Sequence, residues 1–227
     1  MQEREIIDVS GCQVHLWRLA LDAHDTSEDL PSVLSADERD RAARFHDDVD
    51  RKRWATGRAA LRKILGTCTA TDPGELRFQY DEFGKPALAG TAATNAPSFN
   101  MSRSQGFGLC VVARCAALGV DLQRIPDEPA TDVISRHYCS KEERHALDQV
   151  PERDRQSAFC QLWAYKEAYV KARGSGFSLE PDEIAIVPGV DGSARLVRAT
   201  GEPHPERWAL REIRAFPGYR AALALVR

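Results

Sequence analysis

Apolar residues gather in short runs through the first third of the chain, and one longer stretch follows helical spacing. VHLWRLAL (Val14–Leu21) has the apolar, β-prone character of a strand. Ser35 followed by Glu38 resembles a capping box that opens a helix. From Glu38 to Leu65 the apolar residues recur as on one helix face, and Gly66 is placed to end the helix.

The middle of the chain alternates strand-like runs with turns. ELRFQYDEFGKPAL (Glu75–Leu88) predicts a strand, a turn at Gly84 and an extended segment Lys85–Ala87, because the residue before a proline favours extended geometry. Phe107–Ala113 and Ala117–Gln123 are two further strand-like runs close together in sequence. We predict that they pair as a β-hairpin.

The last third predicts two helices and then a series of strands. Ser140–Leu147 is helix-forming, and a longer helix is expected over Arg153–Arg173, ending at Gly174. After it come the strand-like runs EIAIV, SARLV, WALREIRAF and YRAALALV. Helices and strands mix in each half of the chain, so the sequence predicts an α+β fold.

Composition and charge argue against several classes of protein. The 227 residues are 43% hydrophobic and 29% charged, as expected of a globular chain with a sizeable core. The formal net charge of -3 shows no basic excess, which argues against a general nucleic-acid binder. No apolar run approaches the ~18 residues of a membrane span, and the polar start does not resemble a signal peptide. The six cysteines lack CxxC spacing, so we expect reduced thiols in a cytoplasmic protein.

The strand-like run from Leu118 to Gln123 has two unlike faces. Its even-numbered residues are apolar, whereas Asp121 and Gln123 lie on the opposite face. Oxygen donors at this spacing can hold a hard cation such as Mg²⁺, and Glu167 would be the third ligand if the long helix packs over the strand. The other interpretation is a polar outer strand face, with Glu167 and Lys171 forming an i,i+4 surface ion pair.

Positive charge is concentrated in a way that suits phosphate binding. Between Glu38 and Lys63 there are nine Lys or Arg and five Asp or Glu. The candidate phosphate ligands are Arg41, Arg53, Lys85, Arg103 and Lys171. The alternatives are a solvated helix with ion pairs for the first segment and an Asn/Ser turn for SFNMSRSQGFG. Lys85, just before a proline, is expected on an exposed and fairly rigid loop.

Other catalytic and metal-binding patterns are incomplete. His137, Cys139 and His145 could ligate a metal but lack a fourth donor. The sequence contains no G-x-S-x-G elbow, no Walker P-loop and no G-x-G-x-x-G after a strand. A P-loop or Rossmann mechanism is therefore not expected.

Two longer motifs resemble those of a known enzyme family. GVDLQRI (Gly119–Ile125) and WAYKEAYVKARGSGFS (Trp163–Ser178) are similar to the strand and helix motifs of the Sfp-type 4'-phosphopantetheinyl transferases. FGKPAL (Phe83–Leu88) and FNMSRS (Phe99–Ser104) resemble further elements of that family. The resemblance covers residues 35–190, and the helix motif is its most specific part.

The resemblance implies a function and a fold. The family transfers the phosphopantetheine arm of coenzyme A to a serine of an acyl or peptidyl carrier protein and releases adenosine 3',5'-bisphosphate. Its fold is an α+β pseudo-dimer of two similar halves with coenzyme A in the cleft between them. Here the halves would be residues 1–116, with the nucleotide contacts, and 117–227, with the Mg²⁺ site and catalytic helix. A monomer is implied, and the carrier could serve fatty-acid, polyketide, nonribosomal-peptide or siderophore synthesis.

The resemblance also implies roles for single residues. Glu167 would be the general base and Lys171 would stabilise the leaving group. Mg²⁺ would be held by Asp121, Gln123 and Glu167. The implied coenzyme A contacts are Arg41, Arg53, Gly84, Lys85, Pro86, Asn100, Ser102, Arg103, Asp121, Lys166 and Lys171. The carrier protein would dock on Ile134–Leu147, through Arg136, Lys141 and Arg144.

Two positions depart from the family pattern. Arg103 stands where a histidine is usual, and Gln123 stands where a second carboxylate is usual. Arginine still donates to phosphate, but a neutral Gln123 should weaken Mg²⁺ binding. These departures motivate an alternative, a regulatory module that binds coenzyme A without transfer. A structural or interaction protein is a third hypothesis, which gives no reason for a metal-facing carboxylate at Asp121.

Overall fold

Helices and strands mix along the whole chain in the computed structural model, so the predicted α+β class is confirmed. The structure describes residues 2–22, 30–93, 96–127, 138–174, 180–189 and 191–226. The first elements are β1 (Gln2–Val9), β2 (Cys12–Ala20), α1 (Leu30–Val33), α2 (Ala36–Ala43), α3 (Asp48–Thr69), β3 (Arg77–Tyr80), β4 (Pro86–Ala89), β5 (Ser98–Ser104) and β6 (Phe107–Ala113). The later ones are β7 (Ala117–Arg124), α5 (Lys141–Asp148), α6 (Glu152–Arg173), β8 (Ile184–Pro188), β9 (Ser193–Ala199), β10 (Trp208–Glu212) and β11 (Tyr219–Val226).

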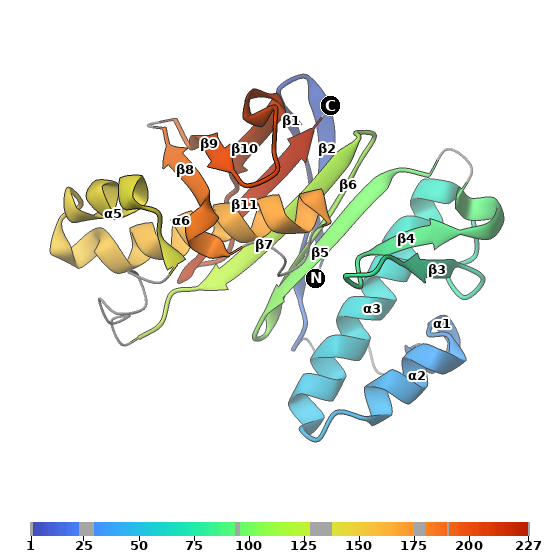
Figure 1. The fold of residues 1–227 in the computed structure, drawn as a ribbon. Helices are drawn as coiled ribbons and strands as arrows, with labels where there is room; N and C mark the ends of the chain where they lie inside the picture. Colours follow the sequence, from blue (N-terminus) through green and yellow to red (C-terminus); the bar gives the residue numbers. More distant parts are fainter. Residues whose placement is uncertain are drawn as a thin grey trace.

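Two antiparallel sheets form the centre of the molecule (Figure 1). One has the strand order β1-β2-β6-β5 and the other β7-β11-β10-β9-β8, while β3 and β4 form a separate hairpin. Apolar side chains of β2, β6, β7 and β11 share one core, α3 packs on the first sheet, and α6 packs on the second. The layers therefore run helix, sheet, sheet, helix. Within the described ranges, no helix combines the length and hydrophobicity that a membrane span needs.

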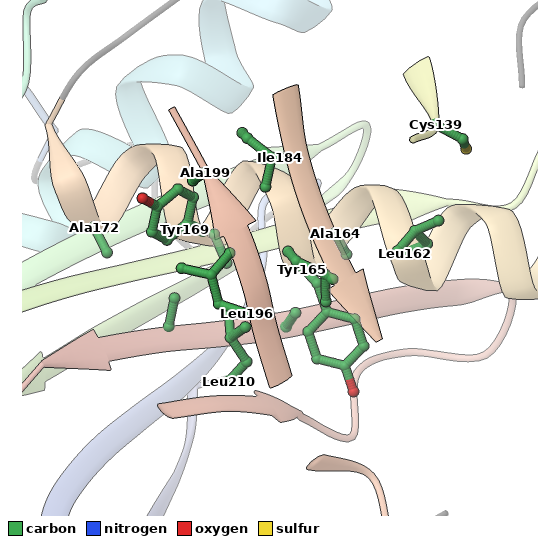
Figure 2. Packing of buried hydrophobic residues seen from close by; sticks show 14 of the residues in the cluster. Cys139, Leu162, Ala164, Tyr165, Tyr169, Ala172, Ile184, Leu196, Ala199 and Leu210 are labelled. Carbon is green, nitrogen blue, oxygen red and sulfur yellow. The ribbon is translucent and has the colours of Figure 1, made fainter. Parts of the chain in front are cut away.

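Helix α6 is fixed by a core that it shares with the second sheet (Figure 2). Tyr165 and Tyr169 project from the helix into this core, toward the strand that carries Leu196. The Tyr165 hydroxyl donates to the Gly192 carbonyl oxygen at 3.1 Å, so the buried phenol keeps a hydrogen-bond partner. The helix ends at Gly174, whose φ of 72° is left-handed, as predicted.

Strand β7 presents its two faces to different neighbours, as its alternation predicted. The apolar face is buried in the core between the sheets. On the other face, a Cβ added to Gly119 would lie 2.1 Å from the Ala168 carbonyl oxygen of α6. Glycine therefore lets the strand backbone approach the helix backbone closely. The close approach brings Asp121, on the same face, to α6.

The predicted β-hairpin of Phe107–Ala113 and Ala117–Gln123 is wrong. β6 pairs with β2 and β5, whereas β7 pairs with β11 at the end of the chain. The tight hairpin joins β5 to β6, and Gln105 in its turn has a φ of 51°. The segment around Ser102 is consequently a strand rather than a turn. Local alternation identified the strands but carries no information on a partner so distant in sequence.

The predicted helix over Glu38–Leu65 is interrupted. The capping box at Ser35 opens α2 as predicted. A second helix, α3, begins after Asp47, whose side chain accepts a hydrogen bond from a backbone N–H of the first turn. Gly66 lies inside α3 rather than at its end, because the chain turns left-handed only at Ala70 (φ 52°).

Candidate active site

Asp121 is the centre of a polar cluster between β7 and α6. Its Oδ1 accepts hydrogen bonds from Lys171 Nζ at 2.5 Å and from Ser102 Oγ at 3.0 Å. Its Oδ2 accepts one from Gln123 Nε2 at 2.6 Å. The residue is only 2% exposed, so these donors replace the water that a free carboxylate would bind. The fold thus joins a strand carboxylate, a helix lysine and a serine of β5.

Glu167 lies one helical turn before Lys171 and is half-buried. Among the described residues, none donates a hydrogen bond to its carboxylate or forms an ion pair with it. Burial raises the pKa of Glu167, the Asp121 carboxylate raises it further, and Lys171 offsets part of this rise. A partly desolvated carboxylate with a raised pKa is suited to accept a proton.

The donor set fits a divalent cation held by two carboxylates. Asp121 and Glu167 repel each other, and a hard cation would relieve that repulsion. No third acidic, His or Cys side chain of the described ranges joins them. Gln123 turns its amide nitrogen toward Asp121, so its predicted role as a ligand is not met in this arrangement. Two carboxylates still suffice, because Mg²⁺ commonly completes its shell with waters and substrate phosphates.

Three arginines line a pocket formed by α2, α3, the β3–β4 hairpin and β5. Arg41 lies over the Trp54 ring at 5.6 Å, and Arg58 donates to the Tyr80 hydroxyl at 2.8 Å. Arg103 forms no hydrogen bond or ion pair with any described residue. Burial lowers the pKa of Arg103, and the positive charges of Arg41 and Arg58 add to this effect. A guanidinium without an anion, crowded by two others, is suited to bind a phosphate group.

Some of the other predicted nucleotide contacts line this arginine pocket, and others lie outside it. Gly84, Pro86 and Asn100 line the pocket. Arg53 does not line it, because its guanidinium is bound by both oxygens of Asp22, at 2.7 and 2.8 Å. Arg58 was not predicted. It lies in the basic segment from Glu38 to Lys63, and that local positive charge was the signal that could have identified it.

Lys85 does not extend from an exposed loop, so that prediction is wrong. Its Nζ donates to the Ala172 carbonyl oxygen of α6 at 2.8 Å and to the Leu118 carbonyl oxygen of β7 at 3.3 Å. Burial lowers the pKa of Lys85. The lysine therefore joins the β3–β4 hairpin to β7, which carries Asp121, and to α6, which carries Lys171.

Lys166 is a buried structural residue, which contradicts its predicted phosphate contact. It is 2% exposed, and its ammonium forms an ion pair with Glu143 at 2.6 Å. The same ammonium donates to the carbonyl oxygens of Tyr138 and Pro181, at 2.8 and 2.6 Å. With three acceptors, the lysine has no N–H left for a substrate.

Part of the predicted carrier-docking segment lies outside the described residues. The undescribed part is residues 134–137, which include Arg136. Residues 175–178, at the end of the helix motif, also lie outside the described ranges. On α5, Lys141 is exposed and Arg144 is half-buried. The helix itself begins with a capping box, as its sequence predicted.

Comparison with known proteins finds one family in both parts of the chain. Residues 117–224 match the model described as 4'-phosphopantetheinyl transferase superfamily, and residues 23–116 match 4'-phosphopantetheinyl transferase, N-terminal. The 4'-phosphopantetheinyl transferase HetI of Nostoc sp. is 37% identical over 178 residues, which cover 78% of this chain and 75% of that protein. The 4'-phosphopantetheinyl transferase Sfp of Bacillus subtilis is 25% identical over 174 residues, which cover 77% of this chain and 75% of that protein.

Proposed function

The chain belongs to the 4'-phosphopantetheinyl transferase superfamily, and from that premise we propose how its residues perform the transfer. It is an enzyme that transfers phosphopantetheine from coenzyme A to a carrier protein. Our proposal concerns the base, the metal ligands, the nucleotide contacts and the division of the chain.

The position of Glu167 carries the mechanistic proposal. Its carboxylate lacks a partner among the described residues and lies near Asp121, one turn from Lys171. Glu167 takes the proton of the carrier serine, and the serine oxygen forms a bond to the phosphorus that bears pantetheine. The bond from that phosphorus to the bridging oxygen breaks, and adenosine 3',5'-bisphosphate leaves with the electron pair. Lys171 lies where an ammonium can offset charge on the departing group.

Asp121 and Glu167 are the proposed Mg²⁺ ligands. When bound, Mg²⁺ would supply charge neutralisation at the pyrophosphate. The Gln123 amide nitrogen donates a hydrogen bond to Asp121 Oδ2 and so orients that carboxylate. The Gln123 carbonyl oxygen could become a further ligand only if the side-chain amide flips. The neutral amide leaves the site one negative charge short of a three-carboxylate set, so we expect a relatively high Mg²⁺ requirement.

The arginine pocket is the proposed site of the nucleotide's 3'-phosphate. Arg103 offers its donors to that group, with Arg41 and Arg58 beside it. The arginine that replaces the family's usual histidine therefore keeps a phosphate-binding function. Gly84 and Pro86, in the same pocket, are proposed to approach the nucleoside.

We also propose that residues 1–116 and 117–227 act as two halves that together complete the site. The arginine pocket comes from the first segment, and Asp121, Glu167 and Lys171 come from the second. A single chain then supplies the whole cleft, so the proposed active form is a monomer. The six unpaired cysteines support a reducing, cytoplasmic location.

Incubation with coenzyme A, Mg²⁺ and several apo carrier proteins tests the proposal. Mass spectrometry should show the phosphopantetheine increment on a carrier serine. Glu167→Gln should slow the appearance of the increment by roughly 10²- to 10⁴-fold, while coenzyme A binding, measured by calorimetry without Mg²⁺, persists. Binding of coenzyme A by the wild type without transfer to any carrier would instead favour the regulatory module. Transfer at the wild-type rate by Glu167→Gln would refute the base assignment.

A further inference from the structure

Strand β7 is an edge strand of its sheet, yet three of its outward backbone groups are bound by side chains. Among the described strands, its one neighbour in the sheet is β11. In an antiparallel pair, alternate residues direct their N–H and C=O groups away from the partner strand. On β7 the groups that meet the N-terminal part of the chain belong to Leu118, Val120 and Leu122.

Three side chains of the N-terminal segment bind these outward groups. Asn100 Oδ1 accepts a hydrogen bond from the Val120 N–H at 2.9 Å. Ser102 Oγ accepts one from the Leu122 N–H at 3.2 Å. Lys85 Nζ donates to the Leu118 carbonyl oxygen at 3.3 Å. These three edge-capping residues take the place of a neighbouring strand.

The edge-capping contacts bracket the functional carboxylate. Asn100 and Ser102 hold the residues on either side of Asp121 along β7. Their own spacing of two on β5 matches the strand period, so both side chains point to the same face of β5. A shift of β7 would therefore move Asp121 relative to Glu167 and Lys171.

Lys85 extends the same arrangement to the helix. Besides Leu118 of β7, its ammonium binds the Ala172 carbonyl oxygen, in the last turn of α6. That turn also carries Lys171. One half-buried ammonium thus connects the strand and the helix whose side chains form the polar cluster.

We propose that Lys85 and Asn100 are positioning residues, which align Asp121 of β7 with Glu167 and Lys171 of α6 by capping the edge of the strand. This assignment rests on the proposed function and replaces their expected role as nucleotide contacts. Two of the Lys85 donors are already bound to backbone carbonyl groups. The Asn100 oxygen is bound to a backbone N–H, and the residue is only 7% exposed.

Hydrogen exchange tests the capping of the strand independently of activity. Asn100→Leu removes the acceptor at similar size, and the Val120 amide should then exchange roughly tenfold faster, since it loses its hydrogen bond. Amides of the β7–β11 ladder serve as the internal control. Asn100→Asp keeps an acceptor oxygen and should restore slow exchange at Val120. Unchanged exchange at Val120 in Asn100→Leu would overturn the assignment of Asn100.

Kinetics separate positioning from substrate binding. Lys85→Met should lower kcat by roughly 10- to 100-fold, because small misplacements of reacting groups are costly. Its Kd for coenzyme A, from calorimetry, should stay near the wild-type value. Lys85→Arg, which keeps the donors, should recover most of kcat, and Lys63→Met on the exposed face of α3 is the matched control.

Two outcomes of the kinetic experiment count against different claims. A tenfold or larger loss of coenzyme A affinity in Lys85→Met, with kcat retained at saturation, would assign Lys85 to the substrate and overturn its positioning role. A wild-type protein that transfers nothing would instead contradict the proposed function. In that case the exchange rate of Val120 still decides whether Asn100 caps the strand.

Discussion

Lys171 Nζ lies 2.5 Å from Asp121 Oδ1, so the helix lysine neutralises the strand carboxylate across the interface of α6 and β7. Ser102 Oγ donates to the same oxygen at 3.0 Å. Glu167, one turn away on α6, has no such partner among the described residues. Two neighbouring carboxylates therefore have different electrostatic environments, and the unpaired one is suited to the acid–base role.

Replacing Glu167 by Gln should lower kcat by roughly 10²- to 10⁴-fold, the usual contribution of a general base. Coenzyme A affinity measured without Mg²⁺ should change little, because the arginine pocket lies elsewhere. Glu152→Gln, exposed at the other end of α6, is the matched control and should remain active. A Glu167→Gln enzyme with a normal kcat would contradict the role of the base.

The same substitution should change how stability depends on pH. The pKa of Glu167 is raised in the fold above the ordinary 4.5, so the folded state binds this proton more tightly than the unfolded state. Its ionisation therefore costs stability as pH rises from the ordinary to the raised pKa. Glu167→Gln should be more stable than the wild type at neutral pH, and the difference should shrink toward pH 4. Thermal unfolding across that range, without Mg²⁺, measures it.

Replacing Arg103 by Met should weaken binding of coenzyme A by about 10- to 100-fold, equivalent to the roughly 1.5–3 kcal/mol of a charge-assisted hydrogen bond. If the 3'-phosphate is its partner, 3'-dephospho-coenzyme A should bind wild type and Arg103→Met almost equally. Arg195→Met, exposed on β9, is the control. An equal loss of affinity for both nucleotides would place the 3'-phosphate elsewhere.

Local pattern was sufficient for those parts of the site that depend on a single element. Alternation along β7 placed Asp121 on the face opposite the apolar residues, and helical spacing placed Glu167 beside Lys171. The helix end at Gly174 also followed from local chemistry, because glycine readily adopts a positive φ. These features need no knowledge of the partner segments.

What the sequence could not predict depends on contacts between distant segments. Lys85 and Lys166 read as exposed cations, yet both donate to backbone carbonyl groups far away in the chain. The pairing of β7 with β11, rather than with its neighbour in sequence, has the same cause. The sequence does not show whether the partner of a lysine is a phosphate, a carboxylate or a carbonyl oxygen, because the ammonium can donate to all three.

Replacing Gln123 by Glu should lower the half-saturating Mg²⁺ concentration, because a carboxylate binds a hard cation better than an amide. The change also removes the Nε2 donor of Asp121 and sets two negative charges side by side. The variant should therefore unfold at lower temperature in chelator and recover with Mg²⁺. Gln149→Glu, exposed at the end of α5, should change neither property. An unchanged Mg²⁺ dependence would show that this position does not influence metal binding.

Replacing Lys166 by Met should destabilise the protein by roughly 3–5 kcal/mol, the usual effect of leaving one member of a buried ion pair without its partner. The uncompensated partner is Glu143. Adding Glu143→Gln should restore part of the stability, which a double-mutant cycle in denaturant would measure. Coenzyme A affinity should be unaffected under conditions where the variant is folded. A selective loss of coenzyme A affinity would instead support the predicted phosphate contact of Lys166 and contradict its structural role.

Replacing Gly119 by Ala should impair both stability and transfer, because the new methyl group would collide with backbone atoms, which cannot move aside as a flexible side chain can. The added Cβ would lie 2.1 Å from the Ala168 carbonyl oxygen and 2.4 Å from the Ala172 nitrogen, both backbone atoms of α6. Strand and helix must then separate, at a cost of about 1–3 kcal/mol or more.

Separation of β7 from α6 would also move Asp121 away from Glu167 and Lys171, so kcat should fall more than coenzyme A affinity. Gly108→Ala is the matched control within a strand, since its added Cβ would lie 3.4 Å from the Ser102 carbonyl oxygen, an ordinary contact. Thermal unfolding and steady-state kinetics of both variants measure the difference. Wild-type kcat in a folded Gly119→Ala protein would mean that the helix–strand distance does not limit the transfer.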